Sequence, residues 1–388
     1  MSKDKINDIE SYRKMRRRKR LLRRTVSIVL ALALLVGIYF AFRYFKDEDI
    51  LKPTTSSTAS GGVSDQTGFP IKLAGEKVGD VGNMGPYITF LSDTKLAIYN
   101  DDGKNIITSP HGYTNPTMQS SSKRTLVYDR GGNEFRVESK GGTEYKQTTT
   151  NPIVTARISE NGTVAVVTQD DRYASVLTVY DANRNEIYRY SSQEPIVAID
   201  LNGSSGCAVA AVSTVKGEVV TTVYALDFSK EKEVFKTAVS GTMVLSIDYK
   251  SGDMIGLIGD DRACVLAKDG KLTATYRYNR TLQMFSNDAD KNMVLMLSDQ
   301  NSSTNNSLVM LDLTGKAVST YKVEDTIRNI ECDGSRVFLL TDSSVKNFDM
   351  SLKLLGSYKC DQDAKKMTFI GSKLYILGAQ EIQKQDVQ

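Results

Sequence analysis

Short apolar runs alternate with polar turns through residues 69–388, and the alternation repeats. Seven four-residue starts each precede a strand-like run, with spacings of 36 to 47 residues: NPTM at 115, NPIV at 151, EPIV at 194, GTMV at 241, RTLQ at 280, DTIR at 325 and AKKM at 364. A second pattern recurs between them. It is an apolar strand end, a tight turn rich in Asp, Asn or Gly, and another strand, as in VYDANRNEIY at 179. This is the local chemistry of a β-hairpin.

Runs such as TVAVVT, GCAVAAVS and RVFLLT are apolar on both faces, which is typical of strands inside stacked sheets. A unit of about 40 residues that holds four short strands is the signature of a β-propeller blade. We therefore predict an all-β fold, a β-propeller over residues 69–388 with about eight four-stranded blades, or seven as the alternative. We expect PIKLAG at 70–75 to close the last blade beside KLYILG and EIQKQDV, because closure removes open sheet edges.

A different pattern precedes the repeats, because residues 25–42 contain no charge. A helix of this length spans about 27 Å, close to the hydrocarbon thickness of a bilayer. A soluble core helix, the alternative, would need a polar stripe, and only Thr25 and Ser27 offer one. We predict one transmembrane helix over residues 25–45. Ala31-Leu32-Ala33 has the form of a cleavage site but lies inside the apolar run, which favours an uncleaved signal anchor over a cleaved signal peptide.

Charge sets the orientation of this helix. Residues 1–24 carry a net charge of +8, which leaves −4 for the rest of a chain whose total is +4. Basic residues are retained on the cytoplasmic side. We therefore predict a single-pass protein of the cell membrane with a cytoplasmic N-terminus (1–24) and an extracytoplasmic propeller (69–388). Residues 46–68, rich in Ser, Thr and Gly, are expected to be a flexible linker.

The N-terminal region also suggests partners. Residues 25–45 would contact the lipid bilayer, and the basic segment would contact anionic lipid, which explains its charge without nucleic acid. Ala33, Gly37 and Ala41 form one small-residue face, the pattern that lets two membrane helices approach closely. A weak homodimer through this face is a hypothesis.

Motifs for catalysis are scarce. His111 is the only histidine, which excludes two-histidine zinc sites, and it lies in SPHGYT, where we expect a solvated loop side chain rather than a catalytic base. The sequence holds neither G-x-S-x-G nor a phosphate-binding loop. No catalytic, cofactor-binding or metal-binding residue is therefore assigned, and no cofactor is expected.

The four cysteines show no C-x-x-C spacing. Cys207 and Cys264 lie in apolar runs, where buried free thiols are expected. Cys332 and Cys360 fall on the first and last strands of one predicted blade, which are not neighbours, so a disulfide between them would need a bent geometry.

Acidic residues gather in several turns. Asp288, Asp290 and Asn292 alternate as in a calcium loop, but Met293 stands where that loop needs Gly, and a polar turn explains the pattern as well. The adjacent acids in NDDG at 100 and GDDR at 259 would point to opposite faces of a strand, so we interpret them as turn residues rather than as an acid/base pair.

The hairpins VYDANRNEIYRY and MLDLTGKAVSTY are similar to those of quinoprotein-like and WD-repeat-like propellers. The whole chain resembles uncharacterised, single-span, membrane-anchored propeller proteins of Gram-positive bacteria, a domain of unknown function. Quinoprotein blades carry a repeated Trp and WD repeats carry the WD dipeptide, whereas this sequence has no Trp. The resemblance therefore implies a fold and an anchor, but it transfers no cofactor site.

Two function classes remain. A propeller offers a broad face of loops around a central channel, which suits a binding platform for a protein or ligand at the cell surface and needs no catalytic residue. The alternative is an extracytoplasmic enzyme, a hydrolase or lyase of unknown substrate, whose residues would be scattered over several blades. The scarcity of motifs favours the platform, with a protein partner outside the membrane.

Overall fold

The computed structural model describes residues 68–73, 75–299 and 305–387, all within one compact unit, Asp65–Gln388. Every regular element assigned there is a β-strand, and no helix in the described part is long and apolar enough to cross a membrane. The cytoplasmic segment, the membrane helix with its Ala33, Gly37 and Ala41 face, and the linker up to residue 67 lie outside the described residues and stay predictions.

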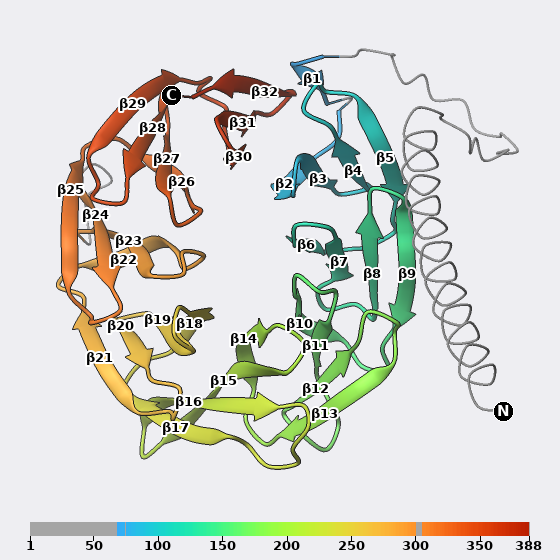
Figure 1. Ribbon diagram of the computed structural model, residues 1–388, viewed down its shortest axis with the longest axis vertical. Helices are drawn as coiled ribbons and strands as arrows, with labels where there is room; N and C mark the ends of the chain where they lie inside the picture. Colours follow the sequence, from blue (N-terminus) through green and yellow to red (C-terminus); the bar gives the residue numbers. More distant parts are fainter. Residues whose placement is uncertain (1–67, 74, 300–304, 388) are drawn as a thin grey trace, which may run out of the picture. The chain divides into compact units, whose positions relative to one another are not determined.

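The strands form eight antiparallel four-stranded sheets, numbered here as blades 1 to 8. Within the unit the blades stand in a ring (Figure 1). Blade 1 contains β2 (Val78–Met84), β3 (Tyr87–Ser92), β4 (Lys95–Tyr99) and β5 (Asn105–Pro110); blade 2 contains β6 (Pro116–Ser120), β7 (Thr125–Asp129), β8 (Glu134–Ser139) and β9 (Gly142–Thr148); blade 3 contains β10 (Ile153–Ile158), β11 (Val164–Thr168), β12 (Ser175–Tyr180) and β13 (Glu186–Ser192); blade 4 contains β14 (Ile196–Asn202), β15 (Gly206–Val215), β16 (Glu218–Asp227) and β17 (Phe235–Ser240).

The second half of the ring follows the same plan. Blade 5 contains β18 (Val244–Lys250), β19 (Met254–Gly259), β20 (Arg262–Leu266) and β21 (Leu272–Arg277); blade 6 contains β22 (Thr281–Ser286), β23 (Asn292–Ser298), β24 (Asn306–Asp312) and β25 (Ala317–Val323); blade 7 contains β26 (Ile327–Cys332), β27 (Arg336–Thr341), β28 (Ser344–Asp349) and β29 (Leu354–Lys359); blade 8 contains β30 (Lys366–Ile370), β31 (Lys373–Leu377), β32 (Glu381–Asp386) and β1 (Ile71–Lys72).

The first strand of each blade lies nearest the centre of the ring, and the fourth lies at the rim (Figure 1). The starts predicted from sequence lead into these first strands: NPIV at 151 precedes β10, and DTIR at 325 precedes β26. The all-β propeller of eight four-stranded blades is thus confirmed, and the alternative of seven is wrong.

The N-terminal strand closes the ring in blade 8, as predicted. Ile71 pairs with Ile382 and Lys72 pairs with Glu381 across β1 and β32, and the Lys72 ammonium forms an ion pair with the Glu381 carboxylate. The peptide N–H of Leu73 donates to the carbonyl of Gln380 at 2.7 Å. The edge of blade 8 is therefore covered by the beginning of the same domain.

A second contact supports this closure. Asp101 lies in the turn of blade 1 that reads NDDG, where it accepts hydrogen bonds from Tyr375 Oη and Lys384 Nζ of blade 8, each at 2.8 Å, and pairs with Lys373. These donors hold the pKa of Asp101 well below its usual range. The residue joins the first and last blades rather than serving its turn alone, because the ring brings together segments that are far apart in sequence.

The apolar core lies in layers between neighbouring blades. Leu177 of blade 3 packs in one cluster with Cys207 and Val209 of blade 4, and the layer between blades 8 and 1 holds Phe90 and Tyr375. The sequence has no Trp, and the large side chains of these layers include the fully buried Phe135, Phe338 and Phe348. Each layer needs both of its blades, so the ring must close before its last layer is buried.

Candidate functional site

The first strands, which surround the opening of the ring, share one irregularity. In six of the eight, the pairing with the second strand skips one residue: Gly79, Val154, Val197, Leu245, Gln283 and Arg328. Such bulges bend a strand and redirect its side chains. Three residues beyond each bulge lies one equivalent position per blade, occupied by Gly82, Arg157, Asp200, Asp248, Ser286 and Glu331. The repeat thus presents a row of mostly polar residues along the inner ring.

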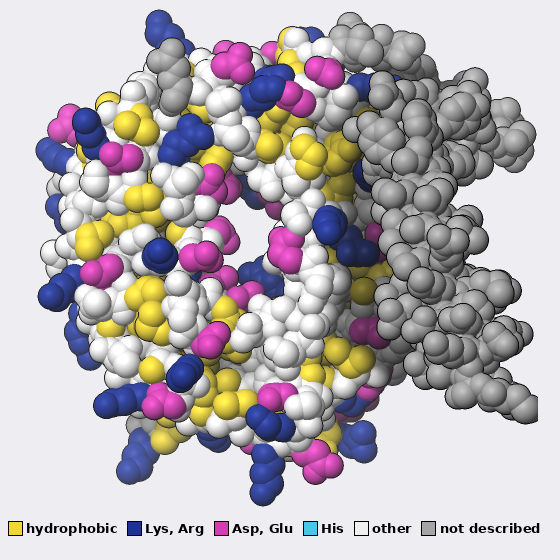
Figure 2. Space-filling model, viewed as in Figure 1, with side chains coloured by type: hydrophobic (Ala, Val, Ile, Leu, Met, Phe, Trp, Pro, Cys, Tyr) yellow, Lys and Arg dark blue, Asp and Glu magenta, His cyan; other side chains and the backbone are white. Residues whose placement is uncertain are grey.

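Carboxylates dominate this region, and Figure 2 shows Asp and Glu side chains gathered at the margin of the central opening. We call one set of them the inner-ring carboxylates: Asp80 on β2, Asp200 on β14, Asp248 on β18, Asp288 after β22 and Glu331 on β26. Burial, followed by the charge of Asp200, raises the pKa of Asp248 to about 7. Burial, followed by the charges of Asp288 and Asp80, raises the pKa of Glu331 to about 8. Both acids therefore hold protons near neutral pH.

Three cations lie among these acids, but they neutralise few of them. Lys366 pairs with Asp80 at 2.7 Å. Lys250 is buried, which lowers its pKa, and its ammonium donates to backbone carbonyls, those of Asn287 and of Ala289, the latter at 3.0 Å. Arg157 Nε donates to the carbonyl of Ile199 at 3.2 Å. Among the described residues, no salt bridge involves Asp200, Asp248, Asp288 or Glu331.

Several side chains of the inner ring join one blade to the next through the backbone. Gln119 Oε1 accepts from the N–H of Ile158 at 2.7 Å, and Asp200 Oδ2 accepts from the N–H of Tyr249 at 2.8 Å. In the other half of the ring, Asn329 Oδ1 accepts from the N–H of Met367 at 3.2 Å. These contacts fix neighbouring first strands against each other, so the polar row is held by a rigid frame.

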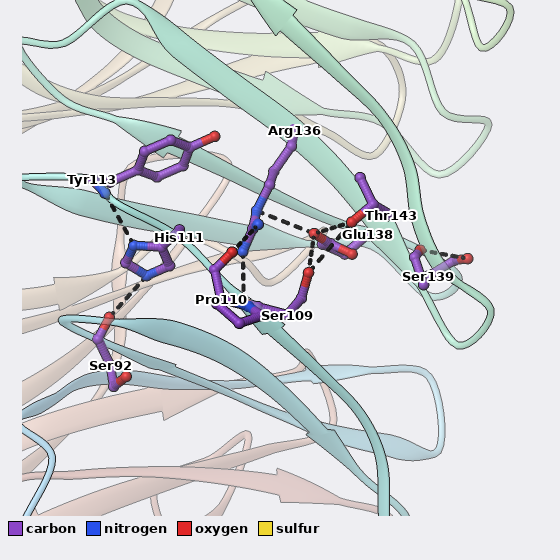
Figure 3. Close-up of polar contacts among 10 residues, drawn as sticks. Ser92, Ser109, Pro110, His111, Tyr113, Arg136, Glu138, Ser139 and Thr143 are labelled. Atoms are coloured by element: carbon purple, nitrogen blue, oxygen red, sulfur yellow. Dashed lines mark hydrogen bonds and ion pairs between the residues drawn. The ribbon is translucent and has the colours of Figure 1, made fainter. Parts of the chain in front are cut away.

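The only histidine is less exposed than predicted. His111 lies between β5 and β6 and is half-buried; its Nδ1 accepts from the N–H of Tyr113 at 3.2 Å, and its Nε2 lies 3.1 Å from the carbonyl of Ser92 (Figure 3). A carbonyl only accepts, so the ring is neutral with its proton on Nε2. Burial, followed by the charge of Arg136, lowers the pKa of His111. The sequence placed it correctly in a loop, but it did not show that folding engages both ring nitrogens.

A buried ion pair lies beside this histidine (Figure 3). Arg136 Nε is 3.1 Å from Glu138 Oε1 on β8, and the two side chains are 1% and 0% exposed. The Arg136 guanidinium also donates to the carbonyls of Pro110 and Ser109 at 2.7 and 2.8 Å. Glu138 Oε1 accepts from Ser109 and Thr143, each at 2.9 Å. Every partner is fixed within blades 1 and 2, so the pair joins two blades and is closed to a ligand.

The other sequence candidates do not assemble into a site. Asp288 accepts a hydrogen bond from Ser286 at 3.2 Å, whereas Asn292 donates to the carbonyl of Leu311 at 3.3 Å. No group of three potential metal ligands occurs in the described part of the chain.

The cysteines are free, and three of the four are buried: Cys207, Cys264 and Cys332, while Cys360 is half-buried. The free, buried thiols predicted at Cys207 and Cys264 are confirmed. Burial raises the pKa of Cys332 to about 11, so its thiol stays protonated and unreactive at neutral pH.

Sequence reasoning missed the inner-ring carboxylates, although a signal was present. An apolar residue followed by an acid recurs near the end of three first strands, as Ile199-Asp200, Ile247-Asp248 and Ile330-Glu331. Superposing the repeats would have shown these pairs in register. What the sequence lacked was the ring, which brings acids 48 to 131 residues apart to one opening.

Comparisons with known proteins agree with this fold. The model of a family of unknown function, DUF5711, matches residues 72–386, and no curated protein matches the chain. Similar solved structures include BamB from Moraxella catarrhalis, with 12% identity, 82% of this chain and 99% of that chain covered, and a TM-score of 0.54.

Two further similar structures are of Sqt1. The Saccharomyces cerevisiae protein is 12% identical, with a TM-score of 0.58, and the match covers 84% of this chain and 100% of that chain. The Chaetomium thermophilum protein was solved bound to the N-terminus of the ribosomal protein L10. It is 11% identical, with a TM-score of 0.58, and the match covers 82% of this chain and 98% of that chain. At such identities the likeness concerns the fold alone.

Proposed function

Because the chain belongs to DUF5711, a family of unknown function, no activity follows from its family, and we propose that it is a binding scaffold for a protein partner. One observation carries the proposal: the closed ring holds four acids, Asp200, Asp248, Asp288 and Glu331, that form no ion pair within the described residues. They lie on a frame fixed by contacts between blades. Ionising Asp248 and Glu331 where they lie costs stability, which is why their pKa values are raised. A partner that supplies the missing charges would recover that cost on binding.

The similar structures support a scaffold over an enzyme. One Sqt1 was solved bound to the N-terminus of another protein, so a ring of this architecture can hold a protein segment. The described residues include no group of three metal ligands, and the only histidine has both nitrogens engaged. A binding scaffold requires neither a metal site nor a free histidine.

The proposal includes a location. The apolar run at 25–45 would anchor the chain as a single-pass protein of the cell membrane, with the basic residues 1–24 in the cytoplasm against anionic lipid and residues 69–388 outside. A homodimer through Ala33, Gly37 and Ala41 would place two rings side by side at the surface. The linker would hold each ring near the membrane, where confinement raises the effective concentration of a membrane-bound partner.

Protease protection tests this topology. Protease added to intact cells or protoplasts should remove the mass that follows residue 43, while a label fused before Met1 stays protected. The same label should become sensitive once the cells are lysed. Protection of the C-terminal domain in intact cells would contradict the proposed location.

One observation favours a second candidate, the extracytoplasmic hydrolase or lyase. The pKa of Glu331 is raised to about 8 by burial and by neighbours that include Asp288, and a protonated acid beside a second carboxylate is the arrangement used in general acid/base catalysis. Purified protein on a panel of hydrolase and lyase substrates distinguishes the two classes, since a scaffold turns over none of them.

A further inference from the structure

An unused acceptor lies within the network of the inner-ring carboxylates. Asn287 is 3% exposed, and its amide reaches into the cluster: Nδ2 donates to Ser246 Oγ at 3.1 Å, and that hydroxyl donates to Asp248 Oδ2 at 3.2 Å. Oδ1 of the same amide has no hydrogen-bond partner among the described residues. Flipping the amide does not help, because Oδ1 would then face the carbonyl of Gly256, which Nδ2 now approaches at 3.5 Å. Buried polar atoms are normally satisfied, so this oxygen lacks a donor.

The cluster as a whole lacks donors in the same way. The buried ammonium of Lys250, which interacts with the charge of Asp248, donates to the carbonyls of Asn287 and Ala289. The charges of Asp200 and Asp288 both act on Asp248. Asp200 accepts a backbone N–H, and Asp288 accepts a serine hydroxyl. Once Asp248 and Glu331 ionise, five carboxylates face three cations, Lys250, Arg157 and Lys366, so negative charge then exceeds positive charge.

From this imbalance we infer that the inner-ring carboxylates bind a lysine or arginine side chain of a protein partner, an inference that rests on the scaffold function proposed above. An ammonium or guanidinium group supplies both missing features, a positive charge and several N–H donors. A metal ion fits less well, because no three ligating residues within the described residues converge on one point. The long side chain of Lys or Arg reaches the acids from an exposed backbone, as in other charge-paired interfaces.

Binding of this kind has a measurable consequence. Asp248 faces Asp200, Lys250, Asp288 and Arg157, and its pKa of about 7 leaves it partly protonated at neutral pH. A cation beside the cluster favours the ionised form and lowers that pKa.

The second protonated acid behaves in the same way. Glu331 faces Asp288, Asp80, Lys366 and Asn329. By linkage, a ligand that lowers the pKa of a protonated acid displaces protons into solution. A cation that binds elsewhere on the surface releases none from these two groups.

Calorimetry on the full-length protein in a non-ionic detergent tests the inference, with tetralysine as the probe and tetraglutamate as the charge control. At pH 7.5 we expect saturable binding of tetralysine only. The buffer takes up the protons that binding releases, and phosphate and Tris differ in ionisation enthalpy. The measured binding enthalpy should therefore differ between the two buffers. The double variant Asp248→Asn/Glu331→Gln should bind at least about tenfold more weakly and release no protons. Glu324→Gln, at an exposed acid of blade 6, should behave as the parent.

Three results would overturn the inference: no binding of tetralysine, binding without proton release, or equal affinity in the double variant. The neutral variants keep the shape of each side chain, and removal of a buried charge favours folding, so loss of binding in them is not loss of structure. A partner captured in cells that is held equally well by the double variant would overturn this inference while leaving the scaffold function intact. No partner at the ring in cells would overturn the scaffold function itself.

Discussion

Replacing Arg136 with Met is expected to lower the free energy of unfolding by about 3–5 kcal/mol, the usual effect of breaking a buried ion pair by removing one partner. Glu138 is 0% exposed, and its Oε2 already lacks a hydrogen-bond partner in the part of the chain that the structure describes. Without the guanidinium, the carboxylate would lose its charge partner inside the layer between blades 1 and 2. The carbonyls of Ser109 and Pro110 would lose their donors as well. Urea unfolding of the full-length protein, followed by circular dichroism, measures the change.

Two further variants make this prediction specific. Arg136→Met/Glu138→Leu should recover most of the loss, because an apolar pair of similar volume often replaces a buried ion pair at little cost. Arg189→Met removes an ion pair with Glu186 in which the side chains are 56% and 42% exposed, and it should cost less than about 1 kcal/mol. An Arg136→Met protein as stable as Arg189→Met would show that the pair does not join the blades.

Replacing Asp248 with Asn, or Glu331 with Gln, is expected to stabilise the protein above neutral pH. The folded pKa values of about 7 and about 8 lie above the ordinary values of 3.8 and 4.5. The folded state therefore holds protons that the unfolded state releases, and the stability of the parent falls as the pH rises from about 4 to 8. A neutral amide removes that fall. Each variant should gain on the order of 4 kcal/mol at pH 8 and little at pH 4.

Thermal denaturation between pH 4 and 9 measures this effect. The gains of the two variants should add incompletely, because both acids interact with Asp288. Asp349→Asn is the matched control: hydrogen bonds from Ser351 and Lys353 lower the pKa of Asp349, so its replacement should bring no gain at high pH. If the denaturation temperatures of parent and variant change in parallel between pH 4 and 9, ionisation of these two acids does not cost stability.

These two expectations separate structure from function in the same ring. The Arg136–Glu138 pair joins two blades, and removal of its arginine alone should destabilise the protein. The acids Asp248 and Glu331, by contrast, cost stability when they ionise where they lie. Side chains that lower the stability of the folded state are typical of binding and catalytic sites. A bound ligand can compensate for this loss of stability. The positions of Asp248 and Glu331 beside the opening therefore support a role in binding rather than in folding.

The sequence predicted the repeat well because blade structure is local. Each strand start and each hairpin turn is encoded within about 40 residues, so the spacing of seven such starts predicted about eight blades, with seven as the alternative. Closure by Ile71 also followed from the sequence, since a ring leaves one edge to cover. Contacts between blades were not predictable in this way. Asp101 meets Tyr375 only because the first and last blades are neighbours.

The candidate site was missed for the same reason. No single repeat holds more than a fragment of it: Asp200, Asp248 and Glu331 belong to three blades and read, one at a time, as ordinary strand residues. Their burial and mutual repulsion arise only when the ring assembles. The raised pKa values, which distinguish these acids from the many surface carboxylates, are therefore properties of the tertiary structure.

Photo-cross-linking in living cells tests the central claim, that the inner ring binds a protein partner. A photoreactive amino acid would replace Val197 or Leu245, which are 40% and 41% exposed on the inner strands β14 and β18. Matched controls are Val318 and Leu355, which are 52% and 50% exposed on the outer strands β25 and β29. We expect a discrete protein adduct from the inner positions, weakened by Asp248→Asn/Glu331→Gln, and none from the outer ones. Adducts from the outer strands alone, or none at the inner ring, would contradict the account.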